Sequence, residues 1–268
     1  MSGIEAFILG IIQGLTEFLP VSSSGHLIIG KELLGVHVNS EAETTFEVLV
    51  HFATVLSTIC VFWTEIWKLF QGLFKFKLNS ETKYVFKICI SMIPVLIVGL
   101  FFEKQVGAAY GKGAVLLVGG MLLVTAILLS LTHYIRFKER RDISYLDSLL
   151  IGISQAIAVL PGLSRSGITI STGLLLGNRK GDIAQFSFLM VLIPILGKAI
   201  LDIMDGRFSQ EISGISIQVM MIGFVAAFTS GWLACKAMIA LVKRSKLIYF
   251  AIYCAVVGVI ALIWQFFV

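Results

Sequence analysis

The sequence predicts an all-α polytopic membrane protein with an inverted-topology repeat, each half a re-entrant helical hairpin plus three transmembrane helices. Apolar residues make up 57% of the 268 residues and charged residues only 14%, a balance unlike that of ordinary soluble domains. The mean hydropathy of +0.95 agrees with this. One short motif also occurs twice. We therefore expect a single integral membrane domain, with repeat halves at residues 1–143 and 144–268.

The transmembrane helices are predicted from apolar runs long enough to cross about 30 Å of hydrocarbon. Because Glu5 and Glu17 interrupt the first apolar stretch, we do not expect a removable signal peptide there, and the first helix is expected to stay. Six spans are predicted, at residues 48–63, 84–102, 114–135, 183–201, 215–241 and 247–268.

The repeated motif reads GIIQGLTEFLPVSSSGHLI at residues 10–28 and GISQAIAVLPGLSRSGITI at residues 152–170. Each copy has a helical pattern, a Leu-Pro turn, a stretch rich in Ser and Gly, and a short apolar helix. Pro20 and Pro161 would interrupt any continuous span, so we interpret both copies as re-entrant hairpins. Such a broken backbone is tolerated at membrane depth only where protein or a polar cavity satisfies its hydrogen bonds.

The charge of the loops predicts how the chain is oriented. Mixed or acidic loops, expected on the outer face, lie at residues 36–45, 103–112 and 204–214. Basic loops, expected in the cytoplasm, lie at residues 68–87, 136–141, 179–180 and 243–246. The alternation works only if each hairpin returns to its own side, the first entering from outside and the second from the cytoplasm. The two halves then have opposite orientation.

The net charge of +5 does not indicate a nucleic-acid partner. The Lys and Arg residues are scattered in loops beside the spans, where orientation signals and lipid headgroup contacts require them. We therefore expect a membrane-embedded protein that binds no nucleic acid.

The first hairpin carries a carboxylate at membrane depth. Gln13 and Glu17 are four residues apart and share one helix face. Inserting a charged group near mid-membrane costs about 2.5–3.5 kcal/mol, so we expect Glu17 to have a functional role. The alternative is a structural hydrogen bond from Glu17 to the serine turn. His26, further along the same copy, is a candidate acid, base or nucleophile, although a single histidine on a helix is usually structural.

Serines begin the short helix of each copy. Backbone N–H groups, hydroxyls and the helix dipole together favour a phosphate at such a position, and the alternative is that the serines simply cap the helix. The candidate phosphate-binding serines are Ser22, Ser23 and Ser24 in the first copy and Ser164 and Ser166 in the second.

The second copy differs from the first in its charged groups. Arg165 stands where the first copy has Ser23, Thr169 adds a hydroxyl, and Glu17 and His26 have apolar counterparts. If the two hairpin turns meet, they form one composite site in which an arginine fork clamps phosphate oxygens. The alternative is that Arg165 merely pairs with Glu17.

Two further pairs of polar residues lie near span ends. Glu47 and His51 share a helix face and are expected either to edge the site or to lie in the solvated interface. Lys198 and Asp202 are interpreted as an intrahelical pair or as groups that extend towards the headgroups.

At these residues the chain resembles the bacterial undecaprenyl pyrophosphate phosphatase family, the BacA or UppP type linked to bacitracin resistance. The first family motif, Glu or Gln followed by three residues and Glu, is found at Gln13 to Glu17, followed by PVSSSGH ending at His26. The second motif, PGxSRSxxT, is present from Pro161 to Thr169. Length and helix pattern agree across essentially the whole chain.

The resemblance implies hydrolysis of a C55 polyprenyl diphosphate to the monophosphate carrier lipid and phosphate, for recycling in peptidoglycan synthesis. It also implies a site open to the outer face of the cytoplasmic membrane and a divalent cation, Mg²⁺ or Ca²⁺. Oxygen ligands suit either ion, so we place it at Glu17 with Gln13. A homodimer is left open.

The expected mechanism rests on the positioning and neutralisation of phosphate charge. The expected catalytic residues are Glu17, Ser23, His26 and Arg165, and the nucleophile is Ser23, His26 or water. The expected phosphate-binding residues are Ser22, Ser24, Ser164, Arg165, Ser166 and Thr169. Lipid transport is the rival function, because inverted repeats with broken helices are typical of transporters. The presence of Glu and His on one hairpin only favours the phosphatase, and a purely structural protein would explain neither Glu17 nor Arg165.

Overall fold

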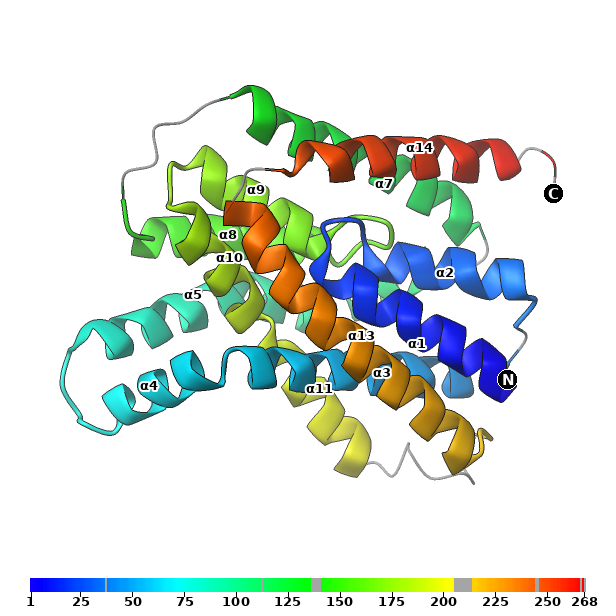
Figure 1. The fold of residues 1–268 in the computed structure, drawn as a ribbon, viewed down its shortest axis with the longest axis horizontal. Coiled ribbons are helices and arrows are strands. Elements are labelled where there is room, and N and C mark those ends of the chain that lie inside the picture. Colours follow the sequence, from blue (N-terminus) through cyan, green and yellow to red (C-terminus); the bar gives the residue numbers. More distant parts are fainter. Residues whose placement is uncertain are drawn as a thin grey trace.

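The computed structural model describes residues 1–36, 38–111, 113–135, 141–204, 214–243, 246–265 and 267. This part of the chain is helical, with one isolated bridge between Arg141 and Asn178 and no named strand. The helices, shown in Figure 1, are α1 (Gly3–Phe18), α2 (Ser23–Leu34), α3 (Ser40–Val61), α4 (Trp63–Leu73), α5 (Ser80–Phe101), α6 (Glu103–Ala109), α7 (Ala114–Tyr134), α8 (Tyr145–Ile157), α9 (Arg165–Leu175), α10 (Lys180–Met190), α11 (Leu192–Met204), α13 (Ile217–Lys243) and α14 (Ile248–Trp264).

Five helical segments in the described residues are long and apolar enough to cross a membrane: Glu41–Val61, Ser80–Phe101, Ala114–Tyr134, Lys180–Leu201 and Ile217–Val242. They confirm five of the six predicted spans. The sixth corresponds to α14, a shorter apolar helix of 17 residues. At a rise of about 1.5 Å per residue it reaches roughly 25 Å, slightly less than a full hydrocarbon core.

The fourth predicted span is divided at Val191 into α10 and α11. Pro194 lies in the first turn of α11, where its missing N–H group costs no helical hydrogen bond. Residues at and after the break, among them Pro194, Ile195 and Lys198, line the cavity described below.

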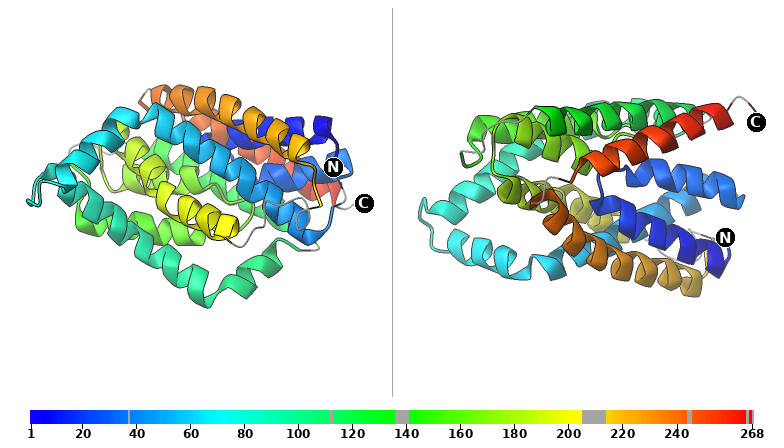
Figure 2. Two further views of the ribbon diagram at one scale, coloured as in Figure 1. Left: turned by 90° about the horizontal axis from the view of Figure 1, so that it is seen from below. Right: turned by 45° about the horizontal axis from the view of Figure 1, so that its top comes forward.

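The two motif copies form helix-turn-helix hairpins that enter from opposite ends of the molecule (Figures 1 and 2). The arms α1 and α2 have their outer ends beside the N-terminus, whereas α8 and α9 extend towards the end where α4 and α5 connect. The turns meet in the middle: Ser166 Oγ donates a hydrogen bond to the Leu19 carbonyl at 3.3 Å. A Cβ added to Gly25 would also lie 3.0 Å from Gly162 Cα.

The first arms of the hairpins pack in matching ways. A Cβ on Gly10 would collide with the Gly223 carbonyl of α13, and a Cβ on the equivalent Gly152 would collide with the Ser91 carbonyl of α5. Each arm therefore lies in close backbone contact with a long helix of the other half of the chain. Both arms begin with a capping box, formed by Ser2 with Glu5 and by Ser144 with Asp147.

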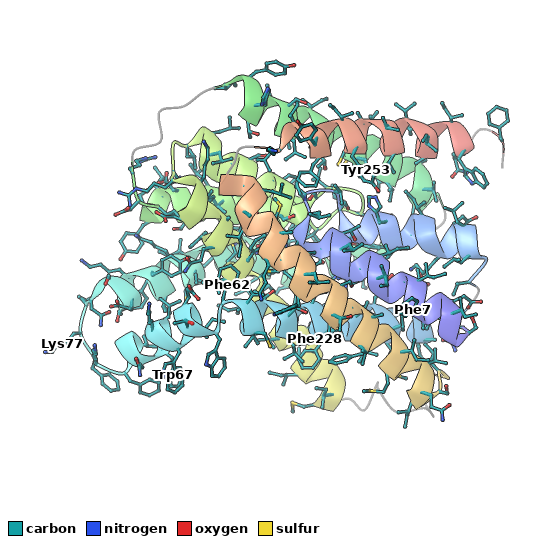
Figure 3. The ribbon with its side chains drawn as sticks, in the orientation of Figure 1. Phe7, Phe62, Trp67, Lys77, Phe228 and Tyr253 are labelled. Atoms are coloured by element: carbon teal, nitrogen blue, oxygen red, sulfur yellow. The ribbon has the colours of Figure 1, made fainter. Side chains whose placement is uncertain are left out.

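The outer surface has the features of a membrane interface. Trp63 and Trp67 are exposed and stacked, with ring centroids 6.2 Å apart, at the start of α4. Figure 3 shows Trp67 and Lys77 at the same end of the molecule, opposite the chain termini. Exposed Trp followed by basic residues is typical of an aromatic belt next to a cytoplasmic loop.

Candidate active site

Glu17 lies buried in the last turn of α1 and contacts both hairpins. Its Oε1 accepts a hydrogen bond from Arg165 Nη2 at 2.5 Å. Its Oε2 accepts hydrogen bonds from Ser23 Oγ at 2.7 Å and from Gln13 Nε2 at 3.0 Å. The structure thus brings together the carboxylate of one motif copy and the guanidinium of the other, as a composite site requires.

Arg165 is the first residue of α9 and is held from two sides. Besides its bond to Glu17, its Nη1 donates to the Ser187 carbonyl of α10 at 3.1 Å. Thr169 lies behind it: Thr169 Oγ1 is 2.6 Å from Ser187 Oγ and donates to the Arg165 carbonyl at 2.8 Å. Two of the five guanidinium N–H groups are used by these bonds to described residues. The guanidinium therefore has a fixed direction and remaining capacity to donate.

Ser22 has a strained backbone. It caps α2 with a φ of 70°, in the left-handed region, whereas the equivalent cap Ser164 has an ordinary φ of −72°. A non-glycine residue pays roughly 1–3 kcal/mol for such a conformation, and strain of this kind concentrates at functional sites. Both serines accept a hydrogen bond from a glycine N–H, at 3.3 Å for Gly25 and 3.1 Å for Gly167. Of the two equivalent cap positions, only the one in the hairpin that carries Glu17 therefore has a strained backbone.

A cavity of about 500 Å³ opens in front of these groups, a size suited to a small-molecule ligand. Seven of the predicted site residues line it: Glu17, Ser22, Ser23, Ser24, Ser164, Arg165 and Ser166. Gln13 and Thr169 do not line it, because both are fully buried behind the charged groups. Their contacts support Glu17 and Arg165 from behind.

His26 points away from the cavity. Its Nδ1 lies 2.8 Å from the Ser22 carbonyl, and its Nε2 lies 2.8 Å from Tyr253 Oη on α14, where Figure 3 shows Tyr253. Because a carbonyl only accepts, Nδ1 carries the proton, and Nε2 of the neutral ring accepts from Tyr253. The two rings stack with centroids 5.5 Å apart. His26 is therefore not among the residues that line the cavity.

A different imidazole edges the site. His51 of α3 lines the cavity, and its Nε2 lies 3.6 Å from Glu17 Oε2. Its Nδ1 is 2.8 Å from the Glu47 carbonyl, which fixes the proton on Nδ1 in the neutral ring. Glu47 Oε1 in turn pairs with Lys31 Nζ of α2 at 2.6 Å. The sequence left two locations open for Glu47 and His51, the edge of the site or the solvated interface. In the structure both residues lie at the edge of the site.

Lys198 and Tyr110 also line the cavity, and the sequence did not predict either of them as a site residue. Lys198 lines the cavity one turn after Pro194, which also lines it. Its expected partner Asp202 has a side chain outside the part of the structure that is described. Tyr110 follows α6, and its Oη donates to the Val159 carbonyl at 3.1 Å. Burial raises the pKa of Tyr110 to about 12, so it stays a donor at neutral pH. The sequence carries no signal that would have placed Tyr110 in the cavity.

The oxygen atoms of Glu17 and Gln13 are the candidate ligands for the expected divalent cation. Within the described residues, no group of three or more His, Cys, Asp or Glu side chains could hold a metal ion. Gln13 Oε1, however, is buried with no hydrogen-bond partner among the described groups, next to the carboxylate. Mg²⁺ commonly takes one or two carboxylates and completes its shell with substrate phosphates and water. Glu17 and Gln13 fit such an ion if the ligand supplies most of the oxygens.

Comparison with known proteins gives the same family along nearly the whole chain. The family profile described as bacitracin resistance protein BacA matches residues 6–260. The chain is 56% identical over 264 residues to an undecaprenyl-diphosphatase of Bacteroides fragilis, with 98% of each chain covered. It is 55% identical over 263 residues to the undecaprenyl-diphosphatase of Parabacteroides distasonis, again with 98% of each covered. The similarly named protein of Oceanobacillus iheyensis is 33% identical over 268 residues, covering 97% of this chain and 96% of its own.

Proposed function

The chain belongs to the BacA bacitracin-resistance family, and we propose from this premise that it is an undecaprenyl-diphosphatase. It hydrolyses the C55 polyprenyl diphosphate to the monophosphate and inorganic phosphate, which recycles the carrier lipid of peptidoglycan synthesis. The observation that carries the proposal is the contact of Glu17, Ser23 and Arg165 at the wall of one cavity. A carboxylate, a hydroxyl and a guanidinium are the groups that phosphoryl transfer requires.

The diphosphate binds between the two hairpin turns. Arg165 takes the phosphate oxygens as a planar fork, and the first turns of α2 and α9 add N–H groups and positive dipole ends. Ser22, Ser24, Ser164 and Ser166 supply hydroxyls to the same cavity. Thr169 holds Arg165 from behind through Ser187 and does not touch the phosphate itself.

Ser23 is the nucleophile in this proposal. Its Oγ already donates to Glu17 Oε2, and Oγ attacks the terminal phosphorus while the bond from that phosphorus to the bridging oxygen breaks. A phosphate that draws Arg165 away from Glu17 leaves the carboxylate free to take the Ser23 proton. The polyprenyl monophosphate departs, and water then releases the phosphate from Ser23. Arg165 stabilises the charge that develops on the transferring group.

His26 and His51 have different roles in this proposal. His26 Nδ1–H holds the carbonyl of the strained Ser22, next to the nucleophile, and His26 moves protons only after leaving Tyr253. His51 faces Glu17 from α3 and stabilises its charge. A divalent cation, Mg²⁺ or Ca²⁺, held by Glu17, Gln13 and the substrate, would neutralise phosphate charge when bound.

The membrane arrangement is an inverted repeat in the inner membrane of a bacterium, with the site on the outer side. The matched packing of Gly10 and Gly152 and the opposite entry of the hairpins support it. Helix α3, which carries Thr44, Glu47, Val48 and His51 of the cavity, begins near the end that holds the N-terminus, opposite Lys77. The positive-inside rule assigns the end with Lys77 to the cytoplasm. A homodimer stays a prediction.

The test is phosphate release by the protein purified in detergent, from farnesyl and undecaprenyl diphosphate. We expect release by the wild type and loss of at least about a hundredfold in Glu17→Ala and Arg165→Ala. A folded wild type that binds the lipid but releases no phosphate would instead indicate lipid transport.

A further inference from the structure

An apolar groove runs over the outer surface of α5, α6 and α8. It has a volume of about 540 Å³ and is formed by Pro94, Ile97 and Val98 of α5, Phe102, Gln105 and Val106 at α6, and Ile153, Ala156, Ile157, Val159 and Leu160 of α8 and its turn. Gln105 is the only polar side chain among these lining residues. We call it the α5–α8 groove.

The α5–α8 groove and the phosphate cavity share a wall. Val159 lines both spaces, and its neighbour Ala158 lines the cavity while Ile157 lines the groove. The Val159 carbonyl also accepts the hydrogen bond from Tyr110, which lines the cavity. The turn of the second hairpin therefore borders both the polar space and the apolar one.

The motif repeat gives Val159 a particular meaning. It stands where the first copy has Glu17, so equivalent positions are polar on one hairpin and apolar on the other. Glu17 binds the groups that face phosphate, whereas Val159 lies at the junction of the cavity and the groove. At this one pair of equivalent positions, the first hairpin places a carboxylate in the cavity and the second places an apolar side chain at the junction with the groove.

We infer that the α5–α8 groove binds the isoprenoid chain of the substrate from its second unit onward, with the first unit at the junction beside Val159. The inference rests on the proposed function. A diphosphate in the cavity is covalently joined to its chain, which must leave through an apolar opening, and burial of each CH₂ group favours binding. A second apolar groove, at Ile29, Leu33 and Ile260, has a volume of about 80 Å³ and shares no lining residue with the cavity.

Bulky substitutions test the groove. Ala156→Trp and Ile97→Trp narrow the α5–α8 groove. Ile260→Trp in the second groove is the matched control, because the exposed fractions of Ile97 and Ile260 are similar, at 47% and 58%. We expect KM for farnesyl diphosphate to rise about tenfold in the two groove variants, with kcat unchanged. KM for dimethylallyl diphosphate, whose chain is a single unit, should change less than twofold, and the control should match the wild type on both substrates.

A binding measurement separates this inference from the proposed function. Each protein is titrated with a farnesyl bisphosphonate, which cannot be hydrolysed, so the affinities do not depend on activity. Weaker binding in the groove variants alone would support the groove even if the wild type released no phosphate. Equal losses for short and long chains, or a loss no greater than that of Ile260→Trp, would overturn it.

Discussion

Glu17 and Arg165 lie 148 residues apart in the chain, and the Oε1 of one accepts a hydrogen bond from the Nη2 of the other at 2.5 Å. Each residue comes from a different hairpin turn, so the pair exists only when both halves are folded against each other. Both side chains are largely shielded from solvent, which strengthens their attraction relative to water. A phosphate that enters the cavity competes with Glu17 for the same guanidinium.

Replacing Arg165 by Lys keeps the charge and removes the fork. We expect kcat/KM for farnesyl diphosphate to fall by about a hundredfold or more, because an ammonium group cannot hold two phosphate oxygens in a fixed plane. Arg141→Lys is the control, since Arg141 pairs with Asp147 at 2.7 Å at the start of α8, outside the cavity. Near-normal turnover by Arg165→Lys would argue against the clamp.

Ser23 and Ser24 are neighbouring hydroxyls with different expected roles. Ser23→Ala should lower kcat by about a thousandfold or more, because it removes the attacking oxygen, whereas Ser24→Ala should cost about tenfold or less. The rate of phosphate release in single-turnover reactions measures the loss in each of the two variants. If Ser23→Ala kept activity close to that of Ser24→Ala, Ser23 would not be the nucleophile, which would leave water or His26.

His26 and Tyr253 distinguish a catalytic imidazole from a structural one. His26→Ala should lower kcat by about a hundredfold, because the Ser22 turn loses its support and the proton path is gone. Tyr253→Phe removes only the hydroxyl that binds Nε2 and should change kcat less than threefold. Equal losses in both variants would mean that His26 works as a fixed unit with Tyr253 and does not move protons.

The hairpins were predictable because their signals are local. Pro20 and Pro161 interrupt the apolar pattern, and the serine-glycine stretches predict helix starts at Ser22 and Ser164. The unlike charges of the two copies predicted one composite site if the turns met, and the structure has Glu17 and Arg165 in contact.

The rest depends on contacts between distant parts of the chain. The direction of His26 is set by Tyr253, 227 residues later, and no spacing along α2 indicates that partner. Lys198 lines the cavity from α11, which is separated from α10 at Val191, whereas hydropathy alone indicates one continuous helix. The strain at Ser22 likewise has no counterpart at the equivalent Ser164.

The packing of the first hairpin can be tested with one methyl group. Gly10→Ala should lower the melting temperature in detergent, because the added Cβ collides with the Gly223 carbonyl. Gly120→Ala is the control, since a Cβ there meets no atom within 4 Å and Ala in a helix is favoured over Gly by about 0.5–1 kcal/mol. Equal or higher stability in both variants would contradict the close contact of α1 with α13.

The divalent cation is tested by removal. A chelator should abolish phosphate release by the wild type, and added Mg²⁺ or Ca²⁺ should restore it. Gln13→Ala should raise the ion concentration needed for half-maximal activity by about tenfold or more, because it removes the buried amide oxygen that would bind the ion. Activity that is unaffected by the chelator would exclude the ion from the site.

The composite site is tested most directly by a double-mutant cycle on phosphate release, with Glu17→Gln, Arg165→Lys and the double variant beside the wild type. Residues that act as one unit are strongly non-additive, so the double variant should lose hardly more kcat/KM than the worse single variant. Losses that multiply would contradict a shared site, because they would mean that the two hairpins act independently.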